Sequence, residues 1–205
     1  MTPGERWDAL WQELGLSAER SCFDALLARH AEPHRAYHTL EHLEECFDLL
    51  DEHRNLARQS TDIELAIWFH DAVYDPRSQD NEQQSAAVAA NFLASAGAAS
   101  ELIARVESLI LATRHVDLPA TGDAQLLVDI DLGILGSEPP RFWEYERQIR
   151  REYEFVPEAE YRRARSAVLA RFLQRPRIYH TPATAAAREQ RARANLAASI
   201  EQLSA

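Results

Sequence analysis

Two short segments carry histidines and a carboxylate at spacings that suit metal binding. The first is Tyr37-His38-Thr39-Leu40-Glu41-His42, and the second is Trp68-Phe69-His70-Asp71. Both lie where apolar residues recur at helical spacing, so some of these polar side chains would face a core. Imidazole and carboxylate together suit a divalent metal ion, and Zn, Mn, Fe, Co, Ni and Mg are all candidates.

The His-Asp pair needs a partner if it is buried. An ionised carboxylate next to a buried imidazole is costly unless both are paired. His42 lies at the edge of the apolar stripe of its helix, and His70 lies within the apolar face of the next one. A metal held by His42, His70 and Asp71 would compensate these groups. A hydrogen-bonded core histidine, or a surface pair of His38 and His42, is the simpler alternative.

A fourth candidate ligand lies in residues 126–135, which are nearly all apolar apart from two aspartates and a glycine. The stretch alternates as a strand would, but no partner strand is visible, so helix is favoured. In a helix Asp129 and Asp131 lie about 200° apart at ~100° per residue, so only one can face the core. The other could accept a hydrogen bond from a ligating imidazole.

The order of these residues resembles the HD-domain superfamily of metal-dependent phosphohydrolases. Its pattern is a His, a His-Asp pair on a later helix and a distal Asp, and it implies that His42, His70, Asp71 and Asp131 hold the metal. Asp131 is preferred because the second Asp of the distal motif is the ligand. The segment Tyr37–His42 is similar to that of the cyclic-nucleotide phosphodiesterases, a branch of the superfamily, which implies that His38 is the general acid.

A small bacterial family of predicted metal-dependent HD phosphohydrolases resembles the chain from about Trp7 to Leu196. The landmarks are Phe69-His70-Asp71-Ala72-Val73-Tyr74-Asp75, Asp80-Asn81-Glu82-Gln83-Gln84-Ser85-Ala86, Ala112-Thr113-Arg114-His115, Asp129-Ile130-Asp131-Leu132 and Ile149-Arg150-Arg151-Glu152-Tyr153. This likeness implies an all-α, single-domain HD-type helical bundle over residues 1–205. The metal-binding core would cover about 34–135, with C-terminal helices 137–203 packed on it. The implied reaction is hydrolysis of a phosphate mono- or diester, such as a nucleotide, by metal-activated water.

Three acidic or imidazole groups are candidates for further roles in the site. Asp71 would be catalytic as well as ligating. Glu82 could point to the metal-bound water or to the leaving group, or it could simply favour the N-terminus of its helix. His115 closes a helix, where it could interact with the helix dipole, contact a phosphate or hold a second metal.

Residues 141–177 contain ten Arg and six Glu and are locally positive in a chain with a net charge of −11. A small phosphorylated substrate would be drawn to such a patch. Arg150 and Arg165 are the candidates for forked, bidentate binding of phosphate. The alternative is a solvated helix face with Glu–Arg pairs at i, i+4.

Composition supports a helical protein in a reducing compartment. Apolar residues make up 46% of the 205 residues, which suits one domain, and abundant Ala, Leu, Glu and Arg favour helix. The negative charge argues against a nucleic-acid polymer as partner. We expect no signal peptide and no membrane span. Two cysteines without a CxxC motif fit the cytoplasm, and an oligomer stays open.

Capping signals give several helix boundaries. Thr2-Pro3 predicts a helix start and Gly15 its end. The segments Thr61–Glu64 and Asp80–Gln83 resemble capping boxes.

Two other functions remain open at this level. An HD-type di-iron oxygenase could use His115 and Glu82 as extra ligands, and a non-catalytic nucleotide-binding sensor could retain the fold. The complete set of four predicted ligands favours the hydrolase over the sensor.

Overall fold

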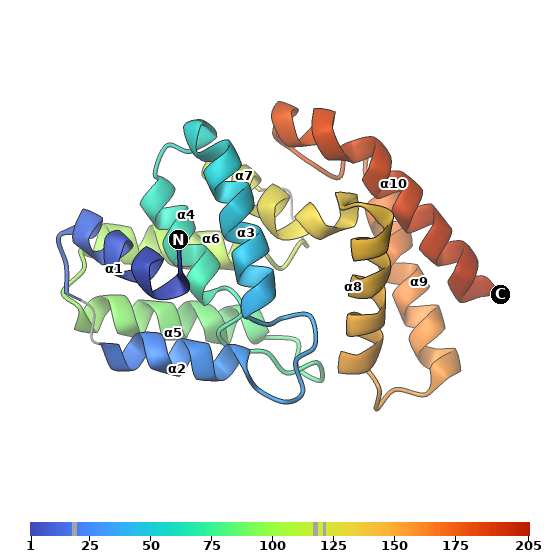
Figure 1. Cartoon of the computed structure of the whole chain (residues 1–205), viewed down its shortest axis with the longest axis horizontal. Helices are drawn as coiled ribbons and strands as arrows, with labels where there is room; N and C mark the ends of the chain where they lie inside the picture. The colour runs from blue at the N-terminus through green and yellow to red at the C-terminus, as the bar shows by residue number, and fades with distance from the viewer. Residues whose placement is uncertain (18–19, 117–118, 121) are drawn as a thin grey trace. The chain divides into compact units, whose positions relative to one another are not determined.

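The computed structural model describes residues 1–17, 20–116, 119–120 and 122–205. Within these ranges the chain forms ten α-helices and two 3-10 helices and no strand, which confirms the all-α prediction (Figure 1). Contacts group the chain into two compact units, Met1–Val128 and Asp129–Ala205. That residues 1–205 form a single domain stays a prediction. None of the described helices is both long and apolar enough to cross a membrane.

The first unit is built around helix α4. Its helices are α1 (Pro3–Leu14), α2 (Arg20–His30), α3 (Leu40–His53), the 3-10 helix η1 (Arg54–Leu56), α4 (Ser60–Phe69), α5 (Asn81–Ser95), α6 (Ser100–Ala112) and most of α7 (Gly122–Asp131). Every residue of α4 from Asp62 to Phe69 is buried, and α4 packs against α1, α3, α5 and α6. A helix that is buried on all sides lies in the middle of a core. The residues that follow α4 are therefore delivered from the centre of the unit.

Aromatic side chains anchor the end of α4. The ring of Trp7 in α1 meets Trp68 edge-to-face at 5.3 Å and lies 6.3 Å from Phe69. Phe47 of α3 packs on Trp68 at 4.8 Å. Each such pair contributes about 0.5–1.5 kcal/mol beyond burial of its area. Because Trp68 and Phe69 immediately precede the His-Asp pair, this packing fixes where that pair begins.

The capping predictions have mixed outcomes. Thr2 caps α1 in a capping box with Glu5, and Gly15 ends the helix with a left-handed φ of 65°, so both boundaries are confirmed. The box at Thr61–Glu64 is wrong, because α4 begins at Ser60 and its N-cap makes no side-chain hydrogen bond. The box at Asp80–Gln83 is also wrong, because the side chain of Asp80 makes no capping hydrogen bond. Helix α5 does begin directly after Asp80.

Distant partners explain the failed box in α4. The carboxylate of Asp62 pairs with Arg105 of α6, and that of Glu64 pairs with Arg54 at 2.8 Å. The backbone N–H groups of the residues just before α4, Arg58 and Gln59, donate to Asp123 instead. The acidic residues of the box are therefore used in tertiary ion pairs.

The second unit holds η2 (Leu132–Gly136), α8 (Pro139–Glu152), α9 (Glu158–Gln174) and α10 (Pro182–Ser204). In Figure 1, α8 and α9 run alongside each other and are joined by a short connection. Glu146 of α8 forms a buried ion pair with Arg165 of α9, 2.5 Å apart, and accepts a hydrogen bond from Ser199 of α10 at 2.9 Å. One carboxylate thus joins three helices.

Residues 126–135 are helical, as predicted from the lack of a partner strand. The α-helix α7 ends at Asp131 and the chain continues as the 3-10 helix η2. Helix α10 approaches η2 closely at Gly136, where an added Cβ would lie 2.7 Å from the Cβ of Arg188. A glycine is therefore required there.

Candidate metal centre

Three of the four predicted ligands converge inside the first unit. The Nε2 atoms of His42 and His70 are 3.2 Å apart. The Oδ2 atom of Asp71 lies 3.1 Å from Nε2 of His70 and 3.7 Å from Nε2 of His42. Both imidazoles are almost fully buried, and the Asp71 side chain is 16% exposed. Two nitrogens and one oxygen therefore face a common point.

Local structure fixes the donor atom of His70. His70 is the C-cap residue of α4, and its backbone N–H donates to Ala66 at 2.8 Å. Its ring Nδ1 lies 2.9 Å from the carbonyl oxygen of Ile67. A carbonyl oxygen can only accept, so Nδ1 carries the proton. In the neutral ring Nε2 then carries the free electron pair that a metal ligand requires.

The donor set fits a divalent cation. With the proton on Nδ1, the electron pair of His70 faces Nε2 of His42 and the carboxylate of Asp71. Such donors at 3.1–3.7 Å need a shared positive charge, which a bound cation would supply. His42 and His70 also belong to a group of described residues, without Asp71, whose donor atoms could hold a metal ion. Two imidazoles and a carboxylate suit a first-row transition metal.

The electrostatics keep Asp71 ionised. Burial alone would raise the pKa of its carboxyl group, but positive charge on the imidazoles of His70, His38 and His42 outweighs burial and holds the pKa well below its usual range. Asp71 is therefore an anion at neutral pH and needs no deprotonation to bind a cation.

The two aspartates of α7 have different surroundings. Asp129 is fully buried and accepts hydrogen bonds at 2.7 Å from the N–H of His180 and from the N–H and hydroxyl of Thr181. The prediction that it bonds a ligating imidazole is wrong, because it holds the N–H groups that precede Pro182 at the start of α10. Asp131 is half-buried in the second unit, and its role as fourth ligand stays a prediction.

His38 lies beside the cluster. It is half-buried, and its ring centroid is 6.1 Å from that of His42. The same ring stacks on Tyr74 with centroids 4.1 Å apart and planes 27° apart. His38 thus lies next to the donor atoms and keeps some exposure to solvent, which suits a group that exchanges protons.

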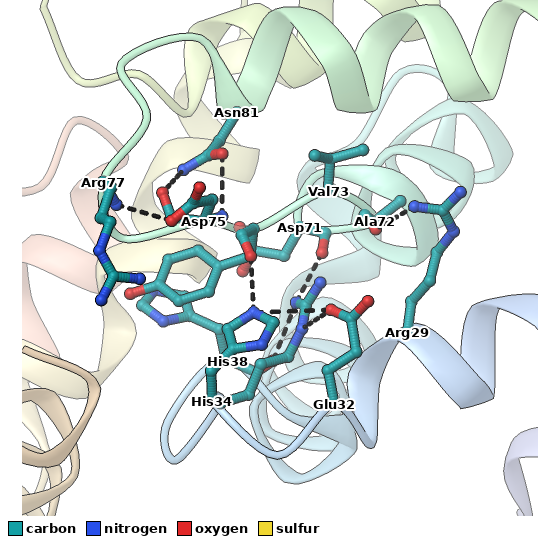
Figure 2. Close-up of polar contacts among 12 residues, drawn as sticks. Arg29, Glu32, His34, His38, Asp71, Ala72, Val73, Asp75, Arg77 and Asn81 are labelled. Carbon is teal, nitrogen blue, oxygen red and sulfur yellow. Dashed lines mark hydrogen bonds and ion pairs between the residues drawn. The ribbon is translucent and has the colours of Figure 1, made fainter.

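The loop after the His-Asp pair is held along its whole length. Each of the five carbonyl groups from Asp71 to Asp75 accepts a hydrogen bond from a side chain of another segment. The donors, in order, are Arg35, Arg29, Ser85, His34 and Asn81. Figure 2 shows Arg29 and His34 on one side of this loop and Asn81 on the other. None of these donors could be predicted from the sequence, because bonds to backbone leave no pattern of residue types.

Glu82 and His115 are less closely defined. Glu82 is half-buried in the first turn of α5, next to Asn81, whose side chain bonds both the N–H and the carbonyl of Asp75. His115 follows α6 with a left-handed φ of 55°, which is unusual for a residue other than glycine. The proposed roles of Glu82 and His115 in the site stay predictions.

Arg165 and Arg150 make protein contacts within the second unit. Besides its ion pair with Glu146, Arg165 donates to the hydroxyl of Tyr145 at 2.9 Å. Arg150 donates to the carbonyls of Tyr153 and Val156 and to Glu158.

Arg150 also lines a pocket of about 440 Å³ with Trp143, Arg147, Tyr161 and Arg162 among its other residues. A phosphate could reach Arg150 only by competing with these contacts. Phosphate binding by Arg150 and Arg165 stays a prediction.

Comparison with known proteins adds no relative: no model of a protein family, no curated protein and no solved structure matches the chain. The functional inference therefore rests on the geometry of the site and on the order of its residues.

Proposed function

We propose that the protein is a metal-dependent phosphohydrolase of the HD type, which hydrolyses a phosphate mono- or diester with an activated water. The observation that carries the proposal is the meeting of His42, His70 and Asp71 around one point, with donor atoms 3.1–3.7 Å apart. These are the residues that the HD pattern selects from the sequence. Asp131 is the proposed fourth ligand.

The residues of the chain prepare the site for this reaction. A bound divalent ion would lower the pKa of water and polarise a phosphoryl oxygen. The proton on Nδ1 of His70 leaves Nε2 as the nitrogen that would bind the ion, and the carboxylate of Asp71 is already ionised. Glu82 is the candidate for orienting the water.

His38 completes the proposed reaction. As the water oxygen bonds to phosphorus, the bond from phosphorus to the leaving oxygen breaks. The protonated imidazole of His38 donates its proton to that oxygen, and such a donation is typically worth 10²–10⁴-fold in rate. Its place beside the cluster, with part of the ring exposed, supports this role.

The test measures bound metal and hydrolysis in the same purified protein. Elemental analysis gives the metal, and a panel of phosphomonoesters and phosphodiesters is assayed with each candidate ion. We expect His42→Ala to lose the metal and at least 10²-fold in activity.

His53→Ala is the matched control. His53 is also a buried histidine of α3, so the variant should keep both metal and activity. Full metal and activity in the His42→Ala protein would overturn the proposal. Two irons per chain, with oxygen consumption, would favour the oxygenase alternative instead.

A further inference from the structure

Arg35 links the two segments that carry the proposed acid and the proposed ligands. Its side chain has no exposed surface. Its Nη1 group donates to the carbonyl of His38 at 3.1 Å and to the carbonyl of Asp71 at 2.8 Å. Its Nε donates to Glu32 at 3.0 Å, which pairs the buried charge. Figure 2 labels Glu32, His38 and Asp71, three residues that Arg35 contacts.

Tyr74 holds the ring of His38 from the side. The two rings are stacked, with centroids 4.1 Å apart. The Cζ atom of Arg35 lies 5.5 Å from the Tyr74 centroid, within the range of a cation–π contact. The carbonyl of Tyr74 accepts a hydrogen bond from Nε2 of His34 at 2.8 Å, which fixes the backbone that carries the ring.

We propose that Arg35 and Tyr74 are positioning residues for His38. Arg35 sets the distance between the backbones of His38 and Asp71, and Tyr74 sets the orientation of the His38 imidazole. The catalytic purpose of this arrangement rests on the proposed function, whereas the positioning itself does not.

The geometry of the segment explains why positioning is needed. His38 precedes α3, which begins at Leu40, so no helical hydrogen bond fixes its backbone. The residue is half-buried, and a partly exposed side chain can in general populate several rotamers. A displacement of about 1 Å in a reacting group can cost about 10²-fold in rate. Arg35 contacts the backbone of His38 and Tyr74 contacts its ring, and both contacts restrict these rotamers.

The first experiment observes the ring directly. NMR spectra of the Zn²⁺-supplemented full-length protein identify the His38 ring protons by their absence in His38→Ala. Stacking on Tyr74 should shift these resonances upfield. We expect Tyr74→Leu to remove the shift and Arg35→Met to reduce it or broaden the signals.

Two controls separate positioning from a general effect on the loop. Tyr74→Phe keeps an aromatic ring and should keep the shift. Arg29→Met removes a hydrogen bond to the neighbouring carbonyl of Ala72 and should also keep it. If His38 resonances are the same in Tyr74→Leu and wild type, the proposal is wrong. If Arg35→Met does not fold, the comparison of Tyr74→Leu with Tyr74→Phe still decides whether the His38 ring is positioned.

The second experiment tests the catalytic purpose through the leaving group. An alkyl phosphate needs proton donation to its leaving oxygen far more than a dinitrophenyl phosphate does. We expect Tyr74→Leu to lose at least 10-fold more kcat on the alkyl ester than on the dinitrophenyl ester, with unchanged metal content.

Equal losses on the two esters would show a merely structural role and overturn the catalytic purpose. A wild-type protein that hydrolyses no phosphate ester would refute the proposed function instead. The NMR comparison would still decide whether Arg35 and Tyr74 position His38.

Discussion

The proton on Nδ1 of His70 decides what the cluster can bind. The Nδ1–H group donates a hydrogen bond to the carbonyl oxygen of Ile67, which lies one turn earlier in the same helix. Helix α4 itself thus leaves Nε2 as the ring nitrogen that can bind a metal ion. Asp71 follows as an anion because three imidazoles surround it. A site prepared in this way requires little rearrangement to accept a cation.

Another histidine, His30, is not among the proposed ligands and gives a prediction about pH. It is 2% exposed. Burial, followed by the charge of Arg35, lowers its pKa from 6.5 to about 3. Between these values the unfolded chain holds a proton on His30 that the folded chain does not. Stability should therefore fall as the pH drops from about 6.5 towards 3, by at most ~1.4 kcal/mol per pH unit for this group.

The measurement is urea unfolding of the metal-free protein between pH 7 and pH 5. His30→Gln should lose less stability over this range than wild type, because the buried group no longer titrates. His34→Gln, which alters an exposed histidine, should follow the wild-type curve. Parallel curves of stability against pH for His30→Gln and wild type would show that His30 does not cause the loss of stability.

At the scale of elements, the loop from Asp71 to Asp75 gives a prediction about stability. The hydroxyl of Ser85 accepts from the N–H of Val73 at 3.0 Å and donates to its carbonyl at 3.3 Å, and Ser85 is fully buried. Ser85→Ala leaves both backbone groups without this partner, which should cost about 1–3 kcal/mol.

Urea unfolding of Ser85→Ala against Ser95→Ala measures this cost. Ser95 lies in the same helix but bonds only the carbonyl of Phe92, at an exposed site. Its replacement should change stability by less than about 0.5 kcal/mol. Equal effects of the two substitutions would show that the loop does not depend on Ser85.

A second prediction at this scale concerns the two faces of α7. The carboxylate of Asp129 accepts three hydrogen bonds, so an amide there would turn an NH₂ group towards a backbone N–H. Asp129→Asn should therefore cost about 2–3 kcal/mol in thermal or urea unfolding, with normal metal content in the folded protein. Asp131→Asn should do the reverse and weaken metal binding with little loss of stability. If Asp129→Asn instead loses the metal, the choice of Asp131 as ligand is wrong.

The elements show what the sequence can predict. His42, His70 and Asp71 could be predicted because their order along the chain resembles the HD pattern, and helical periodicity places His42 and His70 at or within apolar faces. The start of α1 could be predicted because Thr2 caps the helix through Glu5, only three residues further along the chain. Arg35 could not, because its partners are carbonyl groups that every residue possesses. The box at Thr61–Glu64 failed because Asp62 and Arg105, 43 residues apart, form an ion pair that local rules do not include.

At the scale of the whole molecule, net charge opposes the proposed substrate. The chain carries −11 at neutral pH, so a phosphate ester is repelled at long range and salt should ease its approach. Local cations must reverse this effect at the site. A divalent ion in the cluster would supply that charge.

Metal binding should also stabilise the folded chain as a whole. The unfolded chain does not bring His42, His70 and Asp71 together, so an ion binds mainly to the folded state. At 100 times its dissociation constant, an ion contributes ~2.7 kcal/mol, which for a chain of 205 residues corresponds to about 5–10 °C in Tm. We expect EDTA to lower the Tm of wild type by about this amount.

Matched variants decide whether that shift belongs to the cluster. His53→Ala should show the same response to EDTA and to added metal as wild type, whatever its own Tm. His70→Ala should show none, because the remaining donors bind the ion far more weakly. This readout needs no substrate, so it tests the metal centre even before a phosphate ester is found. A shift of wild-type size in His70→Ala would mean that the stabilising ion binds elsewhere in the chain.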